Sequence, residues 1–170
     1  IRIVDLPGTY SLTAFSEEER IAREFIIQQR PDLVVLVLNA AALERSLYLL
    51  SEVLLLDRPV IVALNMLDVA SEQGMQIDTK ALQNALGIPV IPMIAKRNSG
   101  IKELVAQINS FAAGDFKFNP HLPEVSADHR DVYEKILAEV KPYCVAPYTP
   151  QWLTVKLMEG DTAVSQQMEA

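Results

Sequence analysis

Two short apolar runs, at residues 33–38 and 59–64, constrain the fold of this chain more than any other feature of its sequence. Both are rich in valine, isoleucine and leucine and show no alternation with polar residues. Such runs are typical of strands that are buried on both faces of a parallel sheet. A helical pattern at residues 43–56 separates them, and parallel strands need a crossover of this kind. The sequence therefore predicts an α/β fold with a parallel sheet.

The sequence before these runs adds another strand and another helix. Residues 1–5 alternate apolar and polar side chains ahead of a Pro-Gly turn, which predicts a first strand. Ser16 and Glu19 have the spacing of a capping box. A helix is therefore expected from Ser16 to about residue 30, where a proline follows.

Three further elements follow the second apolar run. A short helix is expected between Asp78, a typical N-cap residue, and Gly87, a typical C-terminal glycine. Residues 88–94 predict an edge strand because they include two prolines. Residues 101–111 have the spacing of an amphipathic helix.

The character of the sequence changes after residue 115. The next nine positions contain Asn-Pro and Leu-Pro pairs and are interpreted as a linker. Residues 132–140 and 152–159 then follow with helical periodicity and without a strand pattern. We therefore predict an α/β domain at residues 1–115, a linker at 116–124 and a partial helical domain at 125–170.

Composition argues against several classes of protein. The 170 residues include 15 lysines and arginines against 22 aspartates and glutamates, and this net charge of −7 argues against a nucleic-acid partner. The longest apolar stretch, at residues 33–43, is much shorter than the roughly 20 residues of a membrane-spanning helix. We therefore expect the 170-residue chain to be soluble. A single cysteine, Cys144, cannot form an internal disulfide, which favours a reducing compartment.

Polar or small residues follow three of the predicted strands. In an open parallel sheet, ligands bind beyond the carboxyl ends of the strands. The three groups are Asp5, Leu6, Pro7 and Gly8; Asn65, Met66, Leu67 and Asp68; and Ile94, Ala95 and Lys96. Taken singly, each group is an ordinary turn or helix cap. Their occurrence together, each at a strand end, indicates one ligand site.

In this order the three groups resemble the third, fourth and fifth motifs of the GTPase superfamily. The resemblance implies that Asp5 holds Mg²⁺ through water and that the Gly8 N–H meets the γ-phosphate. It implies that the Asp68 carboxylate accepts both the N1–H and the exocyclic amine of guanine. It further implies that Asn65 braces the loop and the base edge, and that the Ala95 N–H donates to guanine O6.

Longer strings resemble one family in particular, the cytoplasmic G domain of the ferrous iron transport protein B family. They are Thr-Tyr-Ser-Leu at residues 9–12 and Leu-Glu-Arg at 43–45, with Met66 in place of the usual lysine. Residues 152–161 resemble that family's helical domain, which acts like a nucleotide-dissociation inhibitor. The resemblance implies a P-loop NTPase-like parallel sheet flanked by helices and followed by a partial α-helical domain.

The same resemblance implies a function and partners. The chain would be the cytoplasmic guanine-nucleotide-binding part of a membrane ferrous iron transporter, with GTP or GDP and Mg²⁺ as cofactors. It would lie at the cytoplasmic face of the bacterial inner membrane. Its partners would be the transmembrane domain of the same parent chain and, in one alternative, further copies of itself. A switch segment at residues 9–19 would order on GTP binding, and the helical module would sense that change.

Some elements of the GTPase pattern are absent from this sequence. There is no glycine-rich phosphate loop ending in Gly-Lys-Ser/Thr, and no switch threonine precedes Asp5. We expect the chain to be a piece of a longer protein. This piece would lack the N-terminal strands of the fold. Alone, it is expected to bind nucleotide weakly and not to hydrolyse it, so no catalytic residue is assigned. Thr9 stands where many GTPases place a water-positioning glutamine, and Ile94 replaces a usual serine or threonine.

Two alternatives remain at this point. One is another bacterial GTPase, of translation or tRNA modification. The other is a non-catalytic interaction module that has lost its phosphate site. The parent's upstream coding sequence would separate them.

Several other residues have a structural and a functional interpretation. His121 and His129 lack a neighbouring cysteine or carboxylate at ligand spacing, so we expect exposed side chains rather than a metal site. Trp152 is expected to pack within the helical segment rather than anchor a partner. The acidic residues 17–19 suit a helix N-terminus and also fall in the predicted switch.

Overall fold

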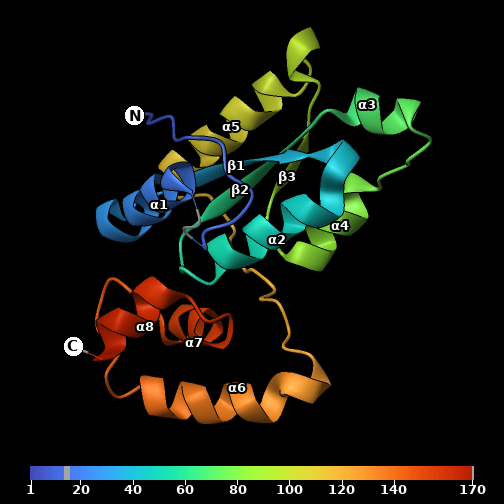
Figure 1. Ribbon diagram of the computed structural model, residues 1–170. Helices are drawn as coiled ribbons and strands as arrows, with labels where there is room; N and C mark the ends of the chain where they lie inside the picture. The colour runs from blue at the N-terminus through green and yellow to red at the C-terminus, as the bar shows by residue number, and fades with distance from the viewer. Residues whose placement is uncertain (14–15, 170) are drawn as a thin grey trace. The chain divides into compact units, whose positions relative to one another are not determined.

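The computed structural model describes residues 1–13 and 16–169 and contains two compact units (Figure 1). The sheet unit is made of residues 32–50 and 58–122. The helical unit is made of residues 1–31, 51–57 and the chain from residue 123 onward. Residues 14 and 15 of the predicted switch segment, and the last residue of the predicted helical domain, lie outside the described residues.

A parallel sheet of three strands forms the centre of the sheet unit. The strands are β1 (Val34–Asn39), β2 (Val60–Asn65) and β3 (Val90–Pro92), in the order β1-β2-β3. Val62 of the central strand lies opposite Leu36 of β1 and Val90 of β3. Residues 60–64 are at most 1% exposed, which explains why β2 consists of aliphatic side chains on both faces. The predicted parallel α/β arrangement is confirmed, as is the edge position of the proline-bearing strand β3.

The prediction that residues 33–38 are buried on both faces is wrong. Val37 is 65% exposed, and most of β1 is only half-buried. In the described part of the chain β1 pairs with β2 alone and is therefore an edge strand. An aliphatic run reports the tendency to form a strand, whereas burial depends on what packs against it.

Helices connect and flank these strands. They are α2 (Leu43–Leu54), which extends into the helical unit, α3 (Leu67–Glu72), α4 (Thr79–Leu86) and α5 (Ile101–Ala112). Single 3₁₀ turns occupy Ala40–Ala42 and Ala95–Arg97. The Asp78 side chain caps α4 by accepting from two backbone N–H groups, and Gly87 ends it with φ +67°, as the sequence predicted. The short helix α3 was not predicted.

Residues 116–122 of the predicted linker belong to the sheet unit and make backbone contacts with the end of α4. The Asn119 N–H donates to the Gly87 carbonyl at 3.3 Å, and the His121 N–H donates to the Leu86 carbonyl at 2.9 Å. An added Cβ on Gly87 would lie 2.1 Å from the Asn119 carbonyl oxygen. The absence of a side chain at Gly87 therefore lets this segment run against the end of α4.

The helical unit combines the first part of the chain with its last part. Its elements are α1 (Glu17–Glu24) with a π-helical turn at Phe25–Gln29, α6 (Ala127–Val140), α7 (Pro150–Met158) and α8 (Thr162–Glu169). Buried side chains from all three segments form its core, including Leu12, Ile26, Val53 and Trp152. The capping box of Ser16 and Glu19 is present as predicted. Helix α8 was not predicted.

The predicted strand at residues 1–5 is wrong. No strand is assigned there, and Ile1 and Ile3 are 88% and 86% exposed. Alternation gives only a tendency, and a strand forms when a neighbour pairs with its backbone. These residues belong to the helical unit. The boundaries of the two compact units therefore differ from the predicted division into residues 1–115, 116–124 and 125–170, and that division stays a prediction.

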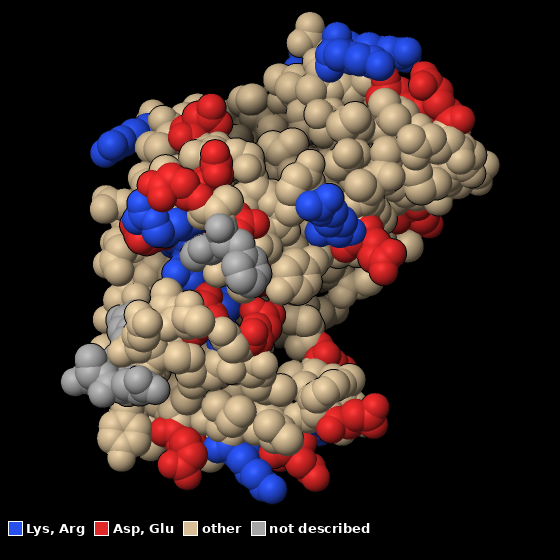
Figure 2. All heavy atoms as spheres, viewed as in Figure 1, with Lys and Arg blue, Asp and Glu red and all other residues tan. Residues whose placement is uncertain are grey.

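Two surface properties bear on the functional argument. None of the described helices is long and apolar enough to span a membrane. On the face shown in Figure 2, basic side chains lie in small groups beside acidic ones, so that face is mixed in charge.

Candidate functional site

The loops that follow β2 and β3 form a small cavity in the sheet unit. Because the two strands are parallel neighbours, their carboxyl ends reach the same edge of the sheet. The cavity has a volume of about 110 Å³. It is lined by Asn65, Met66, Asp68, Val69, Ile94, Ala95 and Lys96. Two of the three predicted groups of site residues are thus brought together. Of the residues in these two groups, Leu67 alone does not line the cavity.

A side-chain hydrogen bond joins the two loops. The Ala95 N–H donates to Asn65 Oδ1 at 2.9 Å, which connects residues 30 positions apart. In this structure Asn65 therefore braces the loop after β3. The resemblance implies that the Ala95 N–H donates to guanine O6, but in this structure it donates to Asn65 Oδ1.

Asp68 places a carboxylate at the cavity from the first turn of α3. Its side chain is 8% exposed, and Lys96 Nζ, on a 62% exposed side chain, lies 2.7 Å from Asp68 Oδ2. The hydrogen bond from Lys96 lowers the pKa of the Asp68 carboxyl below its usual value, and desolvation opposes that shift. Asp68 is therefore ionised at neutral pH and can accept hydrogen bonds at both oxygens.

Met66 occupies an unusual backbone position between β2 and α3. Its φ of +65° places a non-glycine residue in the left-handed region, where it acts as the N-cap of α3. Such a conformation costs about 1–3 kcal/mol and persists where the surrounding structure fixes it. The side chain is 38% exposed. It is uncharged at the position where the resemblance to GTPases would place a lysine.

Gly100 supports the second loop of the site. Ile94 and Ser99 form an antiparallel bridge that closes the loop, and Gly100 follows with φ +85°. An added Cβ on Gly100 would lie 2.3 Å from the Pro92 carbonyl oxygen and 2.8 Å from Met93 Cγ. Sequence reasoning missed both Gly100 and the lining residue Val69. The position of Gly100 directly before a helical pattern was a signal that could have identified it. No sequence signal pointed to Val69.

The first predicted group, Asp5 to Gly8, belongs to the helical unit and does not line the cavity. Asp5 and Gly8 are exposed, whereas Leu6 and Pro7 are half-buried. A Cβ added to Gly8 would meet nothing within 4 Å. Packing within the described chain therefore does not require glycine at this position.

No group of three or more histidine, cysteine and acidic side chains gathers among the described residues. His121 and His129 are exposed, as expected. His121 Nδ1 lies 2.8 Å from the Ala85 carbonyl oxygen, and His129 Nδ1 lies 2.8 Å from Ser126 Oγ. Both histidine rings therefore have hydrogen-bonding partners within the protein.

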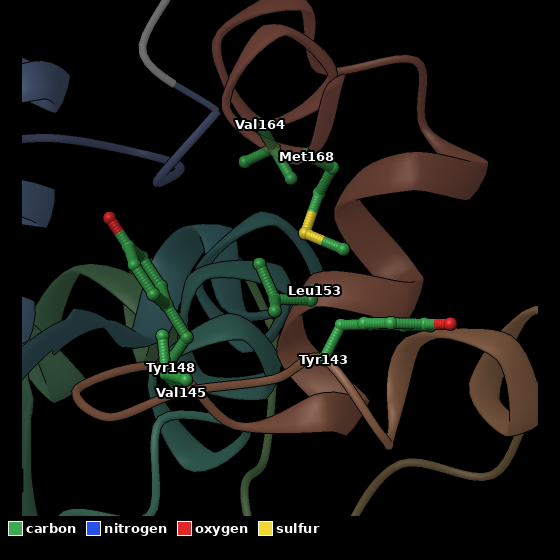
Figure 3. Close-up of a pocket in the computed structure, with 6 residues that line it drawn as sticks. All are labelled: Tyr143, Val145, Tyr148, Leu153, Val164 and Met168. Carbon is green, nitrogen blue, oxygen red and sulfur yellow. The ribbon is translucent and has the colours of Figure 1, made fainter. Parts of the chain in front are cut away.

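A second cavity, also of about 110 Å³, lies within the helical unit (Figure 3). It is lined by Tyr143, Val145, Tyr148, Leu153, Val164 and Met168. These side chains come from the loop before α7, from α7 and from α8. Trp152 is 1% exposed and stacks on Tyr148 with ring centroids 5.7 Å apart, which confirms its predicted packing role. The lining is apolar apart from the tyrosine hydroxyls and offers no evident catalytic group.

Comparisons with known proteins agree with the family inferred from the motifs. Residues 1–108 match the family described as ferrous iron transport protein B. The Fe(2+) transporter FeoB of Escherichia coli strain K12 is 39% identical over 165 residues, which are 95% of this chain and 21% of that protein. The chain thus spans about a fifth of the length of this curated relative.

Solved structures give the same result. The cytosolic domain of L. pneumophila FeoB is 34% identical with a TM-score of 0.82, and the match covers 96% of this chain and 64% of that one. The cytosolic domain of T. maritima FeoB in its GMPPNP form is 32% identical with a TM-score of 0.81, over 96% and 65% of the two chains. The GTPase-like sheet flanked by helices is therefore confirmed. The chain belongs to the ferrous iron transport protein B family.

Proposed function

We propose that the cavity at the ends of β2 and β3 binds the guanine base of GTP and GDP. The observation that supports this most directly is the buried carboxylate of Asp68 beside the joined loops of Asn65 and Ala95. A relative in the same family has been solved in a form with GMPPNP, a guanine nucleotide analogue.

Asp68 would provide the selectivity for guanine. Its two oxygens can accept the N1–H and the exocyclic amine of guanine together. Adenine has no N1–H and would leave the buried carboxylate without these partners, which is the kind of mismatch that discriminates strongly. Lys96 now lies against Asp68 and would have to move aside or share the carboxylate.

The other side of the base would meet Asn65 and Ala95. The Asn65 side-chain amide would donate to the base edge while its oxygen continues to hold the loop. The Ala95 N–H would donate to guanine O6 and to Asn65 Oδ1 at the same time, as a bifurcated hydrogen bond.

Asp5 and Gly8 would act at the phosphate end of the nucleotide. Mg²⁺ bound with nucleotides keeps several waters and needs only one or two protein carboxylates. The single exposed carboxylate of Asp5 fits a water-mediated role and does not form a metal site by itself. When bound, the ion would neutralise phosphate charge, and the Gly8 N–H would donate to the γ-phosphate.

The parent protein would be a membrane ferrous iron transporter in which GTP binding and hydrolysis gate Fe²⁺ uptake. This chain would be its nucleotide-binding part at the cytoplasmic face, and the transmembrane part of the parent would be its partner. The segment at residues 9–19 would change with nucleotide state, and the helical unit would respond to it. Because the sequence contains no phosphate loop, the 170-residue chain alone would bind weakly and not hydrolyse GTP.

A nucleotide titration tests this proposal. Fluorescent GDP should bind the full-length parent protein, and ADP should compete poorly. Asp68→Asn in that protein should weaken GDP binding about 10- to 100-fold. Asp78→Asn is the matched control, because asparagine also caps α4 and the site is untouched. Equal GDP affinity in wild type and Asp68→Asn would refute the assignment. Micromolar affinity of the isolated chain would refute the proposed need for a phosphate loop.

A further inference from the structure

A buried carboxylate in the helical unit binds two partners from opposite ends of the chain. Glu52, near the end of α2, is 2% exposed. Its Oε2 accepts the Leu12 backbone N–H at 2.7 Å, and its Oε1 pairs with Lys156 Nζ of α7. Lys156 is fully buried. One side chain thus joins the segment after Gly8 to the helical tail.

The pair is arranged so that Lys156 has a second acceptor. Lys156 Nζ also lies 2.8 Å from Glu159 Oε2, on a partly exposed side chain. Loss of charge at Glu52 would therefore leave Lys156 paired, whereas loss of Lys156 would leave Glu52 buried without a counter-ion. Burial raises the pKa of the Glu52 carboxyl, while Lys156 and the Leu12 N–H oppose that shift.

Leu12 lies in a segment with internal order of its own. Thr9 Oγ1 donates to the Ser11 carbonyl at 2.6 Å, and Ser11 Oγ donates to Glu19 Oε1 on α1 at 2.9 Å. Leu12 itself is fully buried. A displacement of the backbone at Leu12 would therefore have to break its hydrogen bond to the Glu52 carboxyl group.

We propose that Glu52 is a positioning residue that, with Lys156, fixes the segment after Gly8 and so couples its conformation to helix α7. This inference rests on the proposed nucleotide function, in which that segment responds to nucleotide state. A buried ion pair contributes little net stability compared with an apolar replacement, and its best-attested use is to specify one arrangement. A ligand that favours a different arrangement must outweigh this contact.

Amide exchange and nucleotide affinity test the proposal in the full-length protein. In Glu52→Gln a neutral acceptor replaces a charged one, so hydrogen exchange of peptides covering residues 9–13 should accelerate about fivefold relative to wild type. Peptides covering β2 should be unchanged. The ratio of affinities for GDP and GMPPNP should also shift by about fivefold.

A second buried ion pair of the same unit provides the matched control. Arg23 Nη1 lies 2.7 Å from Asp161 Oδ2, and both side chains are at most 9% exposed. Arg23→Met removes that pair, but Asp161 retains the Ala163 and Val164 N–H groups. This variant should lower stability without accelerating exchange at residues 9–13 or changing the affinity ratio. Lys156→Met is the second test variant. It leaves Glu52 buried without its counter-ion, which favours the neutral acid and a weaker hydrogen bond to Leu12, so it should accelerate exchange at residues 9–13 as Glu52→Gln does.

The outcomes are distinct. Unchanged exchange at residues 9–13 in both Glu52→Gln and Lys156→Met would overturn the proposal, and so would an equal acceleration in Arg23→Met. Faster exchange with an unchanged affinity ratio would overturn the coupling to nucleotide state. A wild-type protein that binds neither nucleotide would overturn the proposed function, and the exchange data would still decide whether Glu52 positions the segment.

Discussion

Substitution of Gly100 by alanine should damage the candidate site without touching any of its lining residues. Gly100 precedes α5 and follows the loop that contains Ala95 and Lys96. Its backbone has φ +85° and ψ −8°, in the left-handed region that favours glycine. An added Cβ would lie 2.3 Å from the Pro92 carbonyl oxygen, a backbone atom that cannot rotate away.

The expected destabilisation has two parts. Backbone strain of a non-glycine residue at positive φ costs about 1 kcal/mol or more. Forcing an atom into occupied space costs about 1–3 kcal/mol in addition. We therefore expect Gly100→Ala to lower the free energy of unfolding by about 2–4 kcal/mol.

Gly74→Ala separates the two parts. Gly74 has φ +79°, close to that of Gly100, but a Cβ there would meet nothing within 4 Å. It lies in the same sheet unit. Equilibrium urea unfolding followed by circular dichroism should show a loss of only about 1 kcal/mol for this control. Equal losses in the two variants would refute the steric argument. Nucleotide affinity should fall in Gly100→Ala and not in Gly74→Ala.

Two further predictions concern the helix cap and the site carboxylate. Ser16→Ala should lower the free energy of unfolding by about 1 kcal/mol in the same assay, because Ser16 Oγ accepts the Glu19 N–H at 3.1 Å; Ser16→Asp, which keeps an acceptor, should not. Lys96→Met should raise the pKa of the Asp68 carboxyl in an NMR titration, since the hydrogen bond from Lys96 lowers it in the wild type. The lowered pKa stabilises the folded state above the ordinary aspartate pKa, and this contribution is lost as the pH falls through the folded value. The stability difference between wild type and Lys96→Met should therefore disappear in acid, and an unchanged Asp68 pKa would contradict the assignment.

Local patterns predicted the elements whose stabilising contacts are also local. The capping box at Ser16 and the cap of α4 at Asp78 join residues two or three positions apart, so their sequence spacing contains the interaction. The aliphatic run of β2 predicts a strand, whereas its burial depends on its central position between β1 and β3. The strand predicted at residues 1–5 failed because pairing depends on a neighbour that the local sequence does not specify.

The sequence by itself determined the strands β1, β2 and β3, most of the helices, the family, and the residues that follow β2 and β3. Only the tertiary structure decided which of them meet. Ala95 binds Asn65 across 30 positions, and Lys156 binds Glu52 across 104. Periodicity and capping reflect contacts between residues close in the chain, whereas the partner of a buried charge depends on which elements pack together.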